Sequence, residues 1–438
     1  MSAPILADRG AVRFWIAVVL TGVGAGIAAG VLTELLELVQ HLVWGGTGLD
    51  LLGPAARSPA WRHVVVLLGA GMLVGGGQIL LSRLSSGNGI EITTAIWFYA
   101  GRLPALRTLA SALLSVVIVG MGAALGREGA PKQAGAVIAN VLCDRTGLPD
   151  EERRLLVACG AGAGMAAAYG VPLGGALFAM EVLRGALALR FVLPALTTTL
   201  VATAVSWAFL PDAVTYTIPS YSGSVSSTAW ALLAGPFLGL VSVLYVRSVA
   251  WADAHRPKAW HRWAVPVLAF AVLGVVSIPF PQILGNGRDV AELTFIGRLS
   301  PFLLLALALL RPAATILCLG SGAPGGLFTP SLAAGALLGG ALGLPWAWLW
   351  PGVPPGLFAL VGAAAMLAAT TQGPVSAVVL IMELTGYARV AILPVLMAVT
   401  TATLVARMIE PRSIYDARLT DEQVRERQRA RDQVSKSE

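Results

Sequence analysis

Charged residues are scarce in this chain. Only 12% of its 438 residues are Asp, Glu, Lys or Arg, whereas 56% are hydrophobic. Soluble domains carry about 25% charged residues, so this composition argues against an ordinary soluble protein. A bilayer admits only helices or closed barrels. Because the apolar runs are far longer than the roughly 10-residue strands of a barrel, we expect an all-α, multi-pass membrane protein.

Cysteine and histidine are also few. The three cysteines are scattered among apolar or small residues, which argues against a disulfide framework and against a zinc site. The four histidines show no metal-ligand spacing, so we expect no metal and no cofactor. The apolar segments contain no GxSxG, no HExxH and no paired aspartates, so the sequence does not predict an enzyme.

The positive charge is concentrated in two stretches. The formal net charge is +7, and basic residues gather in 247–262 ("RSVAWADAHRPKAWHR"), which we expect to be a loop, and from Arg407 onward. By the positive-inside rule, both stretches face the cytoplasm, as would the N-terminus. A basic loop between spans needs no nucleic-acid partner. The first apolar segment runs on for about 25 residues without a clear cleavage site, so it predicts a membrane helix rather than a signal peptide.

Two pairs of similar segments indicate an internal repeat. "GNGIEI" reappears as "GNGRDV" 198 residues later (285 − 87). The segment around Pro172 matches the one around Pro374 at an offset of 202 (374 − 172), and a glutamate, Glu181 or Glu383, follows each proline by nine residues. We expect these glutamates to be structural residues at helix ends. Transporters built from two repeats place their substrate between the halves; chance similarity of Gly/Ala-rich helices is the alternative.

Glycine and proline interrupt many of the apolar segments. Such breaks predict broken and re-entrant helices, which membranes tolerate only where protein buries them or where they line a watery path. The expected parts are a cytoplasmic N-terminus (1–11), membrane repeat 1 (12–210), a connecting loop (211–228), membrane repeat 2 (229–410) and a cytoplasmic C-terminal segment (411–438). The expected location is a plasma or inner cell membrane.

Three glycine-rich turns precede apolar helices. They are "SSGNGIEI" (85–92), "GREGAPKQ" (126–133) and "GSGAPGGLFTP" (320–330). Glycine lets the backbone approach a ligand closely, and a helix N-terminus adds a positive dipole end. Several such ends meeting at mid-membrane would hold a small anion, although packing and kinks use the same residues.

These turns resemble the signatures of a known family. "GREGAPKQ" resembles the GREGP signature, "GSGAPGGLFTP" the GxFxP signature and "GNGIE" the GSGIP signature of the ClC family of chloride channels and chloride/proton antiporters, and the resemblance spans about 12–415. It implies the ClC-type fold, with two repeats of opposite orientation. It also implies a homodimer in the lipid bilayer, joined through helices that include 172–187 and 375–384.

The resemblance implies a role for Glu128 as the gate. Its carboxylate would occupy the outer anion site until chloride displaces it or a proton neutralises it. The backbone N–H groups of Arg127 and Gly129 would also face the ion, and the Arg127 side chain would be structural. The alternative is an Arg127–Glu128 ion pair in a surface loop.

The same resemblance implies a central anion site. The backbone N–H groups of Leu327 and Phe328 would bind the ion, and the Tyr415 hydroxyl would complete the site. Asn88 stands where the family usually has a serine; its NH₂ group still donates, but its bulk and its acceptor oxygen leave the preference among chloride, nitrate and fluoride open. A lone tyrosine near a helix end can instead be an interface anchor.

Two departures from the family pattern bear on mechanism. Val182 stands where antiporters commonly carry an internal proton-transfer glutamate, and a valine cannot relay a proton. We therefore expect gated, passive chloride transport with little or no proton coupling; a chloride/proton or fluoride/proton antiporter is the alternative. Lys132 either raises the local anion concentration or extends its amine to the membrane interface.

Overall fold

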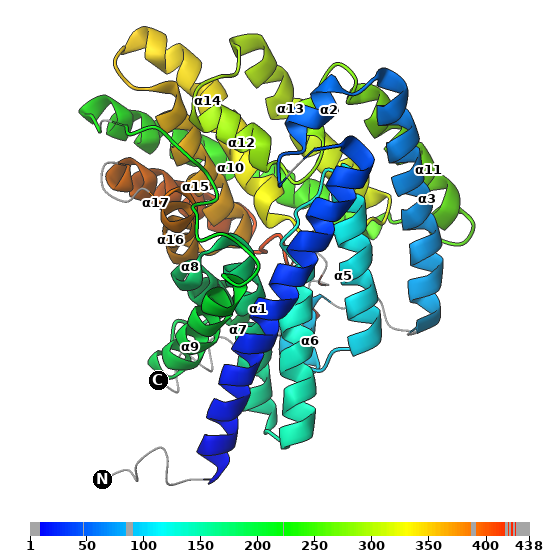
Figure 1. The fold of residues 1–438 in the computed structure, drawn as a ribbon. Helices are drawn as coiled ribbons and strands as arrows, with labels where there is room; N and C mark the ends of the chain where they lie inside the picture. Colours follow the sequence, from blue (N-terminus) through cyan, green and yellow to red (C-terminus); the bar gives the residue numbers. More distant parts are fainter. Residues whose placement is uncertain are drawn as a thin grey trace.

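The computed structural model describes residues 9–46, 48–84, 91–221, 223–386, 391–416, 419, 422–423 and 425. Within these ranges the chain is almost entirely helical (Figure 1). Seven of the described helices have the length and hydropathy to cross a membrane. The expected all-α, multi-pass membrane protein is therefore confirmed.

The helices fall into two consecutive halves. The first half contains α1 (Arg9–Trp44), α2 (Leu52–Arg57), α3 (Ala60–Leu84), α4 (Ile92–Phe98), α5 (Ala105–Gly120), α6 (Gly129–Thr146), α7 (Asp150–Tyr169), α8 (Pro172–Leu177), the π-helix η2 (Phe178–Arg184) and α9 (Leu189–Ser206). The second contains α10 (Val225–Ala254), α11 (His261–Val276), the 3₁₀-helix η3 (Pro281–Ile283), α12 (Arg288–Phe295), α13 (Pro301–Gly320), α14 (Phe328–Leu349), α15 (Pro355–Thr371), α16 (Pro374–Thr385) and α17 (Ile392–Ile409).

The two halves repeat one order of elements. Long helices α1 and α10 open them, and each packs against the last helix of its own half, α9 or α17. Between these ends, α5, α6 and α7 correspond to α13, α14 and α15. Helices α3 and α11 pack against each other and join the halves. The short helices α4 and α12 follow the two related Gly-Asn-Gly sequences along the chain, as the internal repeat predicted.

Small residues allow the central helices to pack closely. A Cβ atom on Gly160 of α7 would collide with the backbone carbonyl of Gly135 in α6. The equivalent pair in the second half, Gly335 of α14 and Gly362 of α15, shows the same clash. Glycine at such contacts lets helix backbones approach one another within a membrane. The N-terminal turns of α6 and α14 and the C-terminal end of α7 adjoin the candidate site, so this close packing supports it.

The proline-led helices differ in length between the halves. In the first, α8 and η2 together run for 13 residues (6 + 7), whereas α16 has 12. The difference arises after the glutamate, because Gly185 ends the first copy four residues after Glu181 and Gly386 ends the second three residues after Glu383. A π-helical turn accommodates one extra residue. The sequence analysis did not predict this turn.

Each of these glutamates caps a helix of the other half. The Glu181 carboxylate accepts a hydrogen bond from the backbone N–H of Ser376 at 2.6 Å. Reciprocally, the Glu383 carboxylate accepts one from the N–H of Gly174, also at 2.6 Å. Both glutamates satisfy backbone N–H groups, as expected for helix-end residues, and a carboxylate is favourable at a helix N-terminus. The pair also joins the two halves at α8 and α16.

Other expectations concern the loops and the cysteines. All three cysteines are buried and free, and no group of His, Cys, Asp or Glu within the described ranges could hold a metal. The expectation that 247–262 forms a loop is wrong, since α10 extends to Ala254 and α11 begins at His261. An 18-residue window of α10 is apolar enough to span a membrane; Arg247 lies near the end of this helix, Arg256 and Lys258 lie in the short connection, and Arg262 lies in the first turn of α11.

Candidate functional site

The carboxylate of Glu128 is fully buried where helices α6 and α14 begin. Its Oε1 accepts a hydrogen bond from the backbone N–H of Phe328 at 2.6 Å. Its Oε2 accepts bonds from the hydroxyls of Thr329, at 3.1 Å, and Tyr169, at 3.4 Å. Among the described residues it forms no ion pair. The carboxylate is therefore bound by neutral donors, which is how dipoles at helix ends bind small anions.

Two glycines frame this carboxylate and join the halves. Gly126 N–H donates to the Gly326 carbonyl at 2.7 Å, and Gly326 N–H donates back to the Gly126 carbonyl at 2.9 Å. A Cβ atom on either glycine would collide with the Glu128 carboxylate. These positions therefore require glycine for space rather than for an unusual backbone conformation. Two of the glycine-rich turns singled out in the sequence, 126–133 and 320–330, meet at this point.

The side chain of Arg127 is buried inside the protein. It is 6% exposed, and its guanidinium lies 4.7 Å from the centre of the Tyr169 ring. It also donates to the carbonyl of Ala168 at 3.4 Å. The alternative of an Arg127–Glu128 ion pair in a surface loop is wrong, because both side chains are buried and the two form no ion pair.

A cavity of about 60 Å³ lies next to this site. Gly129, Leu327 and Tyr415, all expected site residues, contribute to its lining together with Lys132. The Lys132 side chain is 5% exposed, so the alternative that its amine extends to the membrane interface is wrong. Asn88, the remaining expected site residue, lies outside the described residues.

Lys132 and Tyr415 meet inside the cavity. The Lys132 amine donates to the Tyr415 hydroxyl oxygen at 3.4 Å. The same nitrogen lies 4.7 Å from the centre of the Tyr415 ring and 5.2 Å from that of Phe178. These distances suit cation–π contacts. Tyr415 is thus part of the cavity wall.

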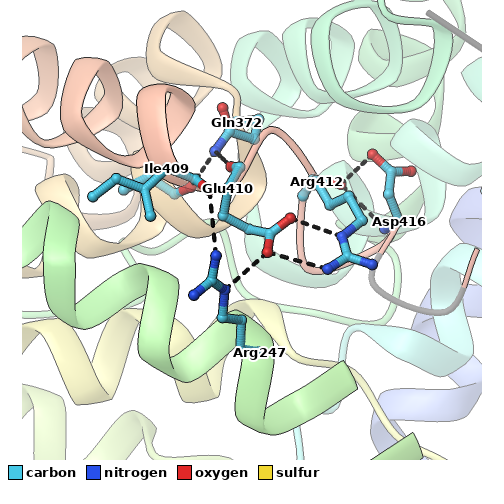
Figure 2. Close-up of polar contacts among 8 residues, drawn as sticks. Arg247, Gln372, Ile409, Glu410, Arg412 and Asp416 are labelled. Carbon is cyan, nitrogen blue, oxygen red and sulfur yellow. Dashed lines mark hydrogen bonds and ion pairs between the residues drawn. The ribbon is translucent and has the colours of Figure 1, made fainter. Parts of the chain in front are cut away.

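The segment that carries Tyr415 is anchored by Glu410 (Figure 2). The Glu410 carboxylate, on a side chain 6% exposed, accepts hydrogen bonds from Arg412 at 2.7 Å and from Arg247 at 3.1 Å. Burial acts to raise the pKa of Glu410, but the hydrogen bonds from Arg412 and Arg247 outweigh it, so the pKa lies below its ordinary value. Glu410 is therefore ionised at neutral pH and fixes the chain just after α17.

A second anchor lies next to the tyrosine itself. The backbone N–H of Ile414 donates to the carbonyl of Thr370, at the end of α15, at 2.7 Å. Tyr415 follows directly, so its side chain is held at a defined place in the cavity. Neither anchor was found in the sequence analysis, because Glu410 stands among other charged residues and nothing nearby marks its partners.

Three further residues contribute to the site without having been predicted. Tyr169 and Thr329 bind the Glu128 carboxylate, and Phe178 contacts the Lys132 amine. Thr329 directly follows Phe328 and could have been found from its helix N-terminal position, whereas Tyr169 and Phe178 lie in apolar segments that carry no such signal. Val182 is buried in η2 and 4% exposed.

Comparison with known proteins gives consistent matches. Residues 70–407 match the family model described as voltage gated chloride channel. The chain is 31% identical to the voltage-gated ClC-type chloride channel ClcB of Citrobacter koseri, over 92% of this chain and 98% of that protein. It is also 31% identical to the H⁺/Cl⁻ exchange transporter ClcA of Vibrio parahaemolyticus, over 68% of this chain and 66% of that protein.

The fold is also similar to a solved structure. It superposes on a slow cyanobacterial Cl⁻/H⁺ antiporter with a TM-score of 0.81 and 23% sequence identity, covering 94% of this chain and 98% of that one. This transporter therefore has the same fold, a likeness that by itself does not establish function.

Proposed function

Because the chain belongs to the voltage-gated chloride channel (ClC) family, we propose that it carries chloride passively across a cell membrane along a path that Glu128 closes. The family consists of membrane channels and transporters, not enzymes. Bacterial relatives favour the inner membrane as its location. The basic residues of 247–262 and those from Arg407 onward favour cytoplasmic termini.

The position of the Glu128 carboxylate carries this proposal. It accepts a backbone N–H at the start of α14, together with two hydroxyls, which is the donor set that a chloride ion would use. A free anion competing for these donors would displace the carboxylate. A proton would remove its charge and weaken its hold on them. Either event opens the path without a change in the surrounding helices.

The buried Val182 favours transport without tight proton coupling. A proton that reaches Glu128 from inside needs a titratable group or a water chain, and a valine side chain supplies neither. The alternative is a chloride/proton or fluoride/proton antiporter. It is supported by relatives named as exchange transporters and by the antiporter of similar fold.

Simultaneous measurement of chloride and proton flux tests the proposal. Purified protein in proteoliposomes would be given an outward chloride gradient, with and without a potassium ionophore to set the voltage. We expect chloride efflux that never drives protons uphill. Uphill proton movement would establish antiport, and the absence of any protein-dependent anion flux would overturn both alternatives.

We further propose a homodimer within the bilayer. Outward-facing leucines on α8, α9 and α17, such as Leu173, Leu193 and Leu404, are half or more exposed in the single chain. A second copy or lipid would cover them. Measurement of the mass of the detergent-solubilised protein by light scattering distinguishes one chain from two.

A further inference from the structure

Two hydroxyls beside the Glu128 carboxylate form a short chain of hydrogen bonds. Oε2 of Glu128 lies 3.1 Å from the hydroxyl of Thr329 and 3.4 Å from that of Tyr169. These two hydroxyls, which we call the hydroxyl pair, lie 2.8 Å from each other. Each hydroxyl has a single hydrogen to donate. One hydrogen fills the contact between the two hydroxyls, so only one is left for the carboxylate.

The distances decide the order of these hydrogens. The contact of Thr329 with Oε2 is the shorter one, so Thr329 donates to the carboxylate and Tyr169 donates to Thr329. Tyr169 then acts on the carboxylate through Thr329, and hydrogen bonds in such a chain strengthen one another. The Arg127 guanidinium lies 4.7 Å from the centre of the Tyr169 ring. A positive charge beside a phenol stabilises negative charge on its oxygen, so it strengthens the hydroxyl as a donor.

The equivalent positions of the other repeat do not form such a pair. Tyr169 is the last residue of α7 and Thr371 is the last residue of α15, at the repeat offset of 202 (371 − 169). The Thr371 hydroxyl bonds within its own helix, to the carbonyl of Leu367 at 2.7 Å. Thr329 is matched by Gly129 at an offset of 200 (329 − 129), and glycine has no side chain. The fold itself therefore does not require the hydroxyl pair, which occurs where the buried carboxylate lies.

The hydroxyl pair favours the ionised form of the carboxylate. The backbone N–H of Phe328 and the hydroxyl of Thr329 donate to the two oxygens of Glu128, so both oxygens meet donors. A protonated carboxyl group would bring a hydrogen that meets another hydrogen unless the Thr329 hydroxyl turned away. Because hydrogen bonds to the charged form favour that form, the pair opposes protonation of Glu128.

We propose that Tyr169 is a positioning residue that, through Thr329, holds Glu128 in the closed position and lowers the pH at which the path opens. The inference rests on the proposed function, in which Glu128 is the gate. The other charged or titratable groups that adjoin Glu128 in sequence or interact with it electrostatically are Arg127, Lys132 of α6, Tyr245 of α10 and Tyr415. All of these stay in place when the hydroxyl pair is altered, so a change in pH response reports on the pair.

Chloride flux at fixed chloride concentration, measured across pH in proteoliposomes of the full-length protein, tests this. Thr329→Val removes one hydroxyl at similar shape and should raise the pH of half-maximal flux by about one unit, because a hydrogen bond to a charged group is lost. Tyr169→Phe should raise it by less, about half a unit. The variant with both changes should match T329V, because Tyr169 acts through Thr329. Thr329→Ser restores a hydroxyl and should recover most of the wild-type pH response.

Two matched controls remove buried hydroxyls elsewhere. Tyr221→Phe and Thr199→Val each delete a hydroxyl that donates to a backbone carbonyl away from Glu128, and both should leave the pH response unchanged. Midpoints of Y169F and T329V equal to those of the controls would overturn the proposal. Shifts that add in the double variant would show that Tyr169 does not act through Thr329, which would overturn its positioning role.

Infrared spectroscopy separates this inference from the proposed function, because it needs no transport. A carboxyl band that appears in acid in the wild type and is absent from Glu128→Gln reports protonation of Glu128. If no chloride is transported but this band appears at higher pH in Y169F than in Y221F, the proposed function fails and the hydroxyl pair stands. If chloride is transported and the band appears at one pH in both variants, the hydroxyl pair fails and the proposed function stands. Should T329V not fold, this comparison of Y169F with Y221F decides.

Discussion

Glu128 and Phe328 meet across the two repeats, with the carboxylate of the first accepting the backbone N–H of the second at 2.6 Å. Their positions differ by 200 (328 − 128), which is also the offset of the bridged glycines Gly126 and Gly326. Equivalent positions of the repeats thus face each other, one supplying the acid and the other the donor. Substitutions on either side of this contact should therefore alter the pH dependence of chloride flux.

Replacing the acid itself is the first prediction. Glu128→Gln removes the titratable group but keeps the size of the side chain, so chloride flux should vary less than about twofold between about pH 4.5 and 7.5. Flux from proteoliposomes measured across this range checks it. Glu34→Gln, on an exposed position of α1, is the control and should respond to pH as the wild type does. A full pH response in E128Q would remove Glu128 from the gate.

The glycine frame gives the second prediction. Gly326→Ala places a Cβ atom where the Glu128 carboxylate lies, so the carboxylate must move. We expect higher flux at neutral pH and a weaker pH response than in the wild type. Gly76→Ala is the control, because its Cβ would make only an ordinary contact, at 3.5 Å, with Trp263. A G326A protein with unchanged flux at every pH would show that this carboxylate position does not close the path.

The reciprocal caps lead to a prediction about stability. Glu383→Gln exchanges a charged acceptor for a neutral one against the backbone N–H of Gly174, and the loss should be about 1–2 kcal/mol. Glu181→Gln should cost a similar amount at α16. Thermal unfolding in detergent measures both, with E34Q as the surface control. Midpoints equal to that of E34Q would mean that the caps contribute nothing to stability.

Glu410 leads to a prediction about pH and stability. Because the pKa of Glu410 is lowered in the folded protein, its contribution is complete above the ordinary value of 4.5 and is lost as pH falls through the lower, folded value. Glu410→Gln should lower the free energy of unfolding by about 1–3 kcal/mol at neutral pH. The difference from the wild type should shrink in acid. A constant difference from neutral pH down to about pH 3 would argue against the ion pairs as its cause.

Much of the site could be predicted from local sequence. The turns before α6 and α14 combine glycine with the start of an apolar run, and this local pattern sufficed to predict the helix N-termini beside the candidate site. The partners of Glu181 and Glu383 could not be predicted, because a helix-end glutamate does not indicate which other helix approaches it. Lys132 was left between two interpretations for the same reason, since only the packing of Phe178 and Tyr415 decides where its amine lies.

The π-helix η2 shows that the structural effect of one inserted residue could not be predicted from the sequence pattern. The segments "FAMEVLRG" and "VLIMELTG" look alike, and both place a glutamate nine residues after a proline. The first has three residues between its glutamate and its terminal glycine, whereas the second has two. A helix can absorb such an insertion as a single π-helical turn. A one-residue difference between two similar segments does not show from sequence alone whether the extra residue extends the helix or widens one turn.

The paired hydrogen bonds between Gly126 and Gly326 also affect how fast the proposed path can open. They fix the backbone on both sides of the Glu128 carboxylate, so under the proposed function Glu128 would open the path by rotation of its own side chain. Rotamer changes take picoseconds to nanoseconds, whereas rearrangements of packed helices take microseconds to milliseconds. Turnover would then be limited by how often an anion or a proton arrives, and it would respond to ion concentration more than to the viscosity of the surrounding lipid.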